Sequence, residues 1–126
     1  MSYKKFLFIA SFCLAIVSCS IFKSITSNTS IAPNKSFVLG DNEHGKFKAK
    51  VKNVSNQPIE IKTKPLGGVA TLVKTLQPNE SITIKIEANT AVIIKNNSND
   101  TASVDLKVNG DTGLSMGFSK QLINQR

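Results

Sequence analysis

Strict alternation of apolar and polar residues is the feature that most limits the folds open to this chain. In residues 46–54 (KFKAKVKNV), Phe47, Ala49 and Val51 alternate with four lysines. The same period of two recurs in three further segments, at residues 59–64, 82–87 and 104–109. Alternate side chains of a β-strand point to opposite faces, so each segment is predicted to be a half-buried strand.

Turn-forming sequences separate these segments and divide the rest of the chain into further strands. The turns are SNQP at 55–58, Gly67-Gly68, QPNE at 77–80, NNSND at 96–100 and Asn109-Gly110. Further strands are predicted at 37–40, 69–76, 90–95 and 113–119. We therefore expect an all-β domain over residues 36–119, a small antiparallel β-sandwich of seven or eight strands, with a small barrel as the alternative. This length supports one modest core.

The first eighteen residues have the three parts of a secretory signal peptide. Met1–Lys5 carries two lysines and no acid, and Phe6–Val17 is uncharged and almost wholly apolar. A helix of these twelve apolar residues would be about 18 Å long. The hydrocarbon core of a bilayer is about 30 Å thick, so the segment is too short for a stable transmembrane helix. Residues 1–18 are therefore predicted to be a signal peptide.

The end of this segment, Ile16-Val17-Ser18-Cys19, resembles the lipobox of bacterial lipoproteins. The resemblance implies that a diacylglycerol is attached to the Cys19 thiol, that the signal is cut before it, and that Cys19 anchors the chain to a membrane of the cell envelope. An ordinary secretory signal that happens to end near a cysteine is the alternative. Cys13 would leave with the signal, so the mature chain would have one thiol and no internal disulfide.

The segments that flank the predicted domain are interpreted as a tether and a tail. Residues 19–35 are rich in Ser, Thr and Asn, which predicts an irregular lipidated tether. Residues 120–126 are predicted to be a C-terminal tail. The lipoprotein resemblance also implies a location in the cell envelope, because Ser20 rather than aspartate follows Cys19 and no acidic cluster comes after it. This pattern favours the outer membrane, on the side that faces the periplasm.

A second resemblance concerns the fold class alone. The sequence LQPNES at 76–81, followed by ITIKI, is similar to the turn and strand of many immunoglobulin-like domains of exported bacterial proteins. The chain has no tryptophan, and the predicted mature chain has no cysteine pair, so the hallmarks of true immunoglobulin domains are missing. The resemblance implies an immunoglobulin-like β-sandwich.

His44, in the sequence DNEHG at 41–45, is the one histidine of the chain. One hypothesis is an envelope enzyme or a metal-dependent site built around it. A zinc site would need further His or Cys ligands, and the only thiol of the predicted mature chain is that of the anchor, Cys19. A polar turn between two strands accounts for the same residues. We therefore expect no catalytic residue, metal or cofactor, and the site around His44 is kept as the alternative function.

The lysines suggest a binding surface. The predicted mature chain has fourteen cations and eight acids, a net charge of +6 once Lys4 and Lys5 are removed. Six lysines are predicted to share the solvent face of one hairpin, with Lys50 facing Lys62 and Lys48 facing Lys64; the set is Lys46, Lys48, Lys50, Lys52, Lys62 and Lys64. Directly opposed like charges destabilise a sheet, so one interpretation is a surface for an anionic partner such as lipid phosphate or acidic polysaccharide.

Two alternatives accompany this interpretation of the lysines. The preferred one is a solvated face whose lysines also keep an edge strand from pairing with other chains, and the other is that the partner is another envelope protein. Nucleic acid is a poor candidate, because all but one of the mature cations are lysine and few aromatic side chains are present for base stacking. The six N-x-S/T sequons are attributed to an asparagine-rich composition; they begin at Asn28, Asn34, Asn53, Asn79, Asn96 and Asn99.

Overall fold

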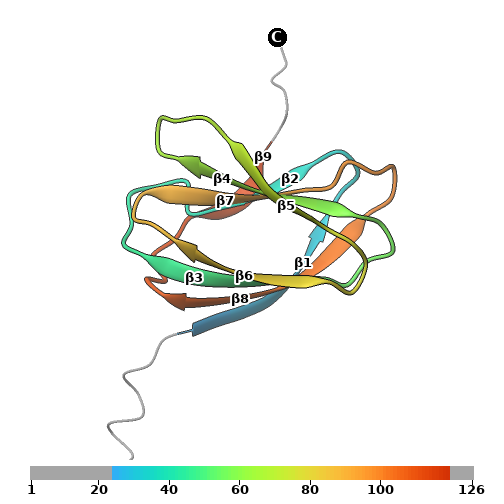
Figure 1. Ribbon diagram of the computed structural model, residues 1–126, viewed down its shortest axis with the longest axis horizontal. Helices are drawn as coiled ribbons and strands as arrows, with labels where there is room; N and C mark the ends of the chain where they lie inside the picture. The colour runs from blue at the N-terminus through green and yellow to red at the C-terminus, as the bar shows by residue number, and fades with distance from the viewer. Residues whose placement is uncertain (1–23, 120–126) are drawn as a thin grey trace, which may run out of the picture.

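The computed structural model describes residues 24–119, which form strands and loops without a helix (Figure 1). The predicted all-β class is confirmed. The strands are β1 (Ser24–Ile31), β2 (Ser36–Leu39), β3 (Phe47–Asn53), β4 (Ile59–Pro65), β5 (Thr71–Leu76), β6 (Ser81–Ile86), β7 (Thr90–Lys95), β8 (Ala102–Gly110) and β9 (Met116–Ser119). Residues 24–119 contain nine strands, whereas the sequence predicts seven or eight. The additional strand is β1.

The strands form two antiparallel sheets that pack face to face (Figure 1). A four-stranded sheet has the order β1-β8-β3-β6, and a five-stranded sheet has the order β5-β4-β7-β2-β9. This arrangement confirms the predicted β-sandwich. Only β4 and β5 follow one another within a sheet, and every other connection between these strands crosses from one sheet to the other.

The crossing connection between β3 and β4 corrects the predicted hairpin. β3 lies between β8 and β6, whereas β4 lies between β5 and β7 in the other sheet. Asn53, at the end of β3, is fully buried. Its side-chain Nδ2 donates to the carbonyl oxygens of Gln57 at 2.8 Å and of Leu76 at 3.0 Å. These bonds hold the loop as an arch between the sheets, which a tight hairpin turn could not form.

The same arch occurs a second time, between β7 and β8. Asn96 is also fully buried, and its Nδ2 donates to the carbonyl oxygen of Asp100 at 2.7 Å. Its Oδ1 accepts from the backbone N–H of Ser98 at 3.0 Å and from the Ser98 hydroxyl at 2.7 Å. In the first arch, Ser55 donates to Asn53 Oδ1 in the same two ways.

These arches give two of the sequons a structural origin. Each consists of a buried Asn, a Ser two residues later that donates to it, and a carbonyl four residues later that accepts from it. The attribution of the N-x-S sequences to composition alone is therefore wrong for Asn53 and Asn96. Both side chains lie inside the fold and satisfy backbone groups that would otherwise be buried without partners.

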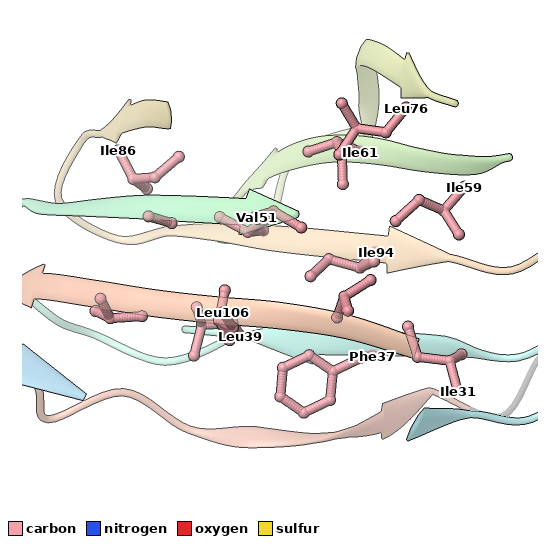
Figure 2. Close-up of a cluster of buried hydrophobic side chains, with 14 of the residues drawn as sticks. Ile31, Phe37, Leu39, Val51, Ile59, Ile61, Leu76, Ile86, Ile94 and Leu106 are labelled. Carbon is pink, nitrogen blue, oxygen red and sulfur yellow. The ribbon is translucent and has the colours of Figure 1, made fainter. Parts of the chain in front are cut away.

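The inward faces of the two sheets form one hydrophobic core (Figure 2). Val51 pairs with Leu106 in the four-stranded sheet, and Ile61 pairs with Ile94 in the five-stranded sheet. All four side chains are at most 1% exposed. Full burial of a side chain of this size stabilises a fold by about 1.5–3 kcal/mol. Residues 24–119 contain no cysteine, so apolar packing and hydrogen bonds hold this part of the chain together.

β1 corrects the predicted organisation of the chain. It pairs with β8 along its whole length, from Ser24 opposite Asn109 to Ile31 opposite Ala102. Ile31 is fully buried, whereas most of the other side chains of β1 are small and polar. The irregular tether predicted for residues 19–35 is therefore wrong for Ser24–Ile31, because an edge strand can be held by its backbone ladder with few apolar side chains. The predicted signal (1–18), the rest of the segment before β1 (19–23) and the tail (120–126) lie outside the described residues.

The strand register defines two ends of the sandwich. Ser24 pairs with Asn109 near the end of β8, and Pro65 at the end of β4 pairs with Thr90 at the start of β7. The loops at 40–46, 66–70, 87–89 and 111–115 therefore share one end with the start of β1, on the left in Figure 1. We call it the Ser24 end. Both asparagine arches lie at the opposite end, which we call the arch end.

Candidate functional site

Five lysines gather on the outer face of the four-stranded sheet. β3 contributes three of them at alternate positions, and β6 and β8 contribute one each; we call the set Lys48, Lys50, Lys52, Lys85 and Lys107 the basic face. All five are exposed. Their apolar neighbours along each strand point into the core, so the alternation that buries one face of the sheet places these ammonium groups on the other.

The register sets lysines directly opposite one another on this face. Lys48 faces Lys85 across the β3–β6 pair, and Lys50 faces Lys107 across the β3–β8 pair. Within residues 24–119, no carboxylate makes an ion pair with any of the five. Directly opposed like charges destabilise a sheet, and a bound anion would relieve that repulsion.

One acid lies among the outward side chains of these four strands. Asp105 stands opposite Lys52, and its Oδ1 accepts a hydrogen bond from Asn28 Nδ2 at 2.8 Å. A shallow hollow of about 230 Å³ opens beside it, lined by Thr26, Lys50, Lys52, Asp105, Leu106 and Lys107. Lysine ammonium groups are strong donors with no acceptor capacity, so the face can bind phosphate or carboxylate groups as a set of point charges.

The predicted six-lysine hairpin face is wrong in its geometry. Lys62 and Lys64 lie on β4, in the five-stranded sheet, and Lys62 makes an ion pair with Glu60 at 3.8 Å. Lys46 precedes β3 and makes an ion pair with Glu87 at 3.7 Å. Three of the six, Lys48, Lys50 and Lys52, do share one face.

Lys85 and Lys107 complete the basic face in place of the misplaced lysines. The alternation in the sequence already predicted that both would point outward from their strands. The alternation does not predict the order of the strands in the sheet, because β6 and β8 are distant from β3 in the sequence. The sequence therefore predicts that each lysine points outward, but it does not predict that the five lysines lie on one face.

His44 is held inside the Ser24 end by backbone groups. It is 9% exposed, and its ring packs edge-on against Phe47 with centroids 5.2 Å apart. The ring Nε2 lies 2.9 Å from the Thr90 carbonyl oxygen, and Nδ1 lies 2.6 Å from the carbonyl oxygen of Gly45. A neutral ring has one N–H and donates to one of the two, whereas a doubly protonated ring donates to both.

The backbone of His44 is fixed as well. Its N–H donates to Asn89 Oδ1 at 2.9 Å, and its carbonyl oxygen accepts from the Asn89 N–H at 3.1 Å. These contacts join the loop at 40–46 to the loop at 87–89, which gives His44 a structural role at the Ser24 end. Among residues 24–119, no group of three or more His, Cys, Asp or Glu side chains is placed to hold a metal ion.

The predicted anchor, Cys19, lies outside the described residues, and its lipidation stays a prediction. Among residues 24–119 there is no helix long and apolar enough to cross a bilayer.

Comparison with known proteins supports the fold and nothing finer. No protein-family model and no curated protein matches this chain. The capsular polysaccharide assembling protein CapF from Staphylococcus aureus is similar in structure, with a TM-score of 0.50 and 16% identity over 69% of this chain. The match spans only 24% of CapF. The Yersinia pseudotuberculosis-derived mitogen matches with a TM-score of 0.45 and 14% identity, over 75% of this chain and 96% of its own.

Proposed function

We propose that this chain is a lipid-anchored protein of the bacterial cell envelope whose β-sandwich binds an anionic envelope surface through the basic face. Cys19 is the proposed anchor, supported by the lipobox-like sequence before it. The outer membrane, on its periplasmic side, is the proposed location. The small β-domain itself is established by the structure, and the anchor and the ligand are the proposal.

The strand register is the observation that carries the binding proposal. It places Lys48 beside Lys85 and Lys50 beside Lys107 without ion-pairing partners among the described residues. A surface whose only task was solubility would gain more stability from mixed charges, because opposed lysines repel. The cluster therefore favours a partner that supplies the missing negative charge.

The chemistry of the face favours repeated negative charge over a small, shaped ligand. The face is flat apart from shallow hollows, and its cations are lysines, whereas arginine is the side chain suited to bidentate recognition of one phosphate. Each lysine close to an anionic bilayer contributes about 1 kcal/mol, so five acting together are sufficient for binding where one is not. Lipid phosphates and acidic polysaccharides both present such charge.

The test uses the mature chain with Cys19→Ser, so that no lipid contributes to binding. Its sedimentation with anionic and with neutral vesicles is compared, and an acidic polysaccharide is added in a third arm as a competitor. The variant Lys50→Gln/Lys85→Gln/Lys107→Gln removes three charges from the basic face. The control Lys35→Gln/Lys62→Gln/Lys95→Gln removes three charges elsewhere on the domain.

We expect binding to anionic vesicles that the basic-face variant loses and the control keeps. Binding must also weaken with salt, because the Debye length falls from about 10 Å at 0.1 M to about 3 Å at 1 M. Competition by the polysaccharide at low concentration would identify it as the preferred source of charge. Equal loss in the two triple variants would show that net charge alone matters and would refute a role for this face.

A further inference from the structure

Exposed apolar side chains occur in the connection between β4 and β5 and at the start of β5. Val69 is 81% exposed, the largest value for a large apolar side chain among the described residues. Leu66, Leu72 and Val73 are also exposed, so four such side chains lie within eight residues. Single exposed apolar residues are common, whereas several close together in the sequence make this connection a candidate contact with a partner or a membrane. We call residues 66–69 (LGGV) the apolar tip.

The tip is held in its exposed position by backbone hydrogen bonds. The Gly68 N–H donates to the Pro65 carbonyl oxygen at 2.8 Å, and Gly67 has a φ of 74°, as the third residue of a type II turn requires. The Leu66 N–H donates to the Asn89 carbonyl oxygen at 2.8 Å. Asn89 is the residue that also fixes the backbone of His44. A side chain added at Gly67 would meet no atom within 4 Å, so the turn projects into open space.

The tip lies at the end of the sandwich where the chain enters. Pro65, directly before the tip, pairs with Thr90, and both belong to the Ser24 end defined by the register. In the sequence, only residues 20–23 stand between Cys19 and Ser24. A fully extended chain advances at most about 3.3–3.6 Å per residue, so five steps span about 18 Å at most. A lipid on Cys19 would therefore hold the Ser24 end close to the membrane.

We propose that the apolar tip inserts into the membrane interface as a second, non-covalent contact, with Leu66 and Val69 entering among the lipids. This inference rests on the proposed lipid anchor, since the anchor brings the Ser24 end to the bilayer. Other loops at this end carry the acids Asp41, Glu43, Glu87 and Asp111. Insertion therefore relies on apolar burial and requires no anionic lipid, which separates it from binding by the basic face.

The test supplies the anchor chemically. The mature chain, residues 19–126, is coupled through its only thiol, Cys19, to a maleimide lipid in neutral phosphatidylcholine vesicles. The chain has no tryptophan, so Val69→Trp introduces a single indole fluorophore at the tip. The matched control is Val54→Trp, at a residue that is 38% exposed in the loop between β3 and β4, at the arch end. Circular dichroism checks that both variants are folded.

We expect the emission of Val69→Trp to move to shorter wavelength on coupling and to be quenched by lipids brominated on their acyl chains. The emission of Val54→Trp is expected to stay unchanged and unquenched. Absent quenching at Val69, or equal quenching at both positions, would overturn the inference. A protein partner would then be the remaining explanation for the tip.

A second measurement tests the two side chains directly. Partitioning of the uncoupled chain into the same neutral vesicles is compared with that of Leu66→Ser/Val69→Ser, with Val54→Ser as the control. The burial of two such side chains predicts partitioning that is about tenfold weaker, or more, for the double variant. Unchanged partitioning would overturn the inference. Neither arm depends on acylation in the cell, so failure of the tip and failure of the anchor are separate results.

Discussion

Asn96 offers the most informative test of the fold, because one side chain completes a whole arch. The two hydrogens of its Nδ2 are shared among three carbonyl oxygens, those of Ile31 at 3.0 Å, Ala32 at 3.3 Å and Asp100 at 2.7 Å, and its Oδ1 accepts twice from Ser98. Each such bond contributes about 0.5–1.5 kcal/mol net, and a buried group left without a partner costs about 1–3 kcal/mol. We expect Asn96→Ala to lower the free energy of unfolding by about 3–5 kcal/mol.

A loss of this size is a large part of the 5–15 kcal/mol that a typical domain has. At a urea m-value of about 1 kcal/mol per M, typical of a small domain, the unfolding midpoint falls by about 3 M or more. The assay is urea unfolding of the Cys19→Ser mature chain, followed by circular dichroism. The control is Asn97→Ala, the exposed neighbour, with an expected change within about 0.5 kcal/mol.

The variant Asn96→Asp separates the two halves of the arch. It keeps an oxygen for Ser98 but replaces the donor Nδ2 with an acceptor that faces carbonyl oxygens. We expect it to be destabilised about as much as Asn96→Ala, because a charge buried without a partner is added to the lost donors. A loss below about 1 kcal/mol for both variants would refute the arch as a source of stability.

Two further predictions concern the anchor and the histidine. Cys19→Ser is expected to abolish metabolic labelling of the chain by fatty acid in a bacterial host, and unchanged labelling would rule out Cys19 as the anchor. His44→Ala is expected to lower the free energy of unfolding by about 2–3 kcal/mol, because it removes a buried ring with its contacts to Phe47 and the Thr90 carbonyl. Thermal unfolding measures that loss, and the folded variant is expected to bind anionic vesicles as before; lost binding with unchanged stability would instead favour a functional site at His44.

The sequence was sufficient to predict the strands whose core faces are continuous. In β3, the predicted alternation matches the burial of Phe47, Ala49 and Val51 residue by residue. β1 was missed because Ser, Thr and Asn fill it, and composition of that kind is as typical of a loop as of an edge strand. Its position is fixed by backbone pairing with β8, a partner more than seventy residues away in the sequence.

Strand order was the part of the candidate site that periodicity could not supply. A period of two says which face a lysine occupies on its own strand and nothing about which strand lies beside it. The short connection from β3 to β4 was interpreted as a hairpin turn, yet the buried Asn53 makes it a crossing between sheets. The same N-x-S-N pattern occurs at residues 53–56 and 96–99, in both cases at the end of a strand. This repeat could have indicated that both connections have the same structure.

The apolar tip and the basic face lie on different sides of the domain, and this affects which anionic ligand the basic face can reach. If the Ser24 end faces the bilayer, the strands point toward the membrane. The outer face of the four-stranded sheet is then roughly perpendicular to the membrane plane. Lys48 and Lys85 then lie nearest the headgroups, Lys50 and Lys107 form the next row along the strands, and Lys52 lies farthest away. A flat bilayer would meet the first row only, whereas a flexible anionic polymer can follow all five lysines. A lipid on Cys19 would keep the face near one membrane, and polymers attached to that membrane would then be present at high effective concentration. In the proposed anchored orientation, an acidic polysaccharide would therefore be a better ligand for the basic face than lipid phosphate.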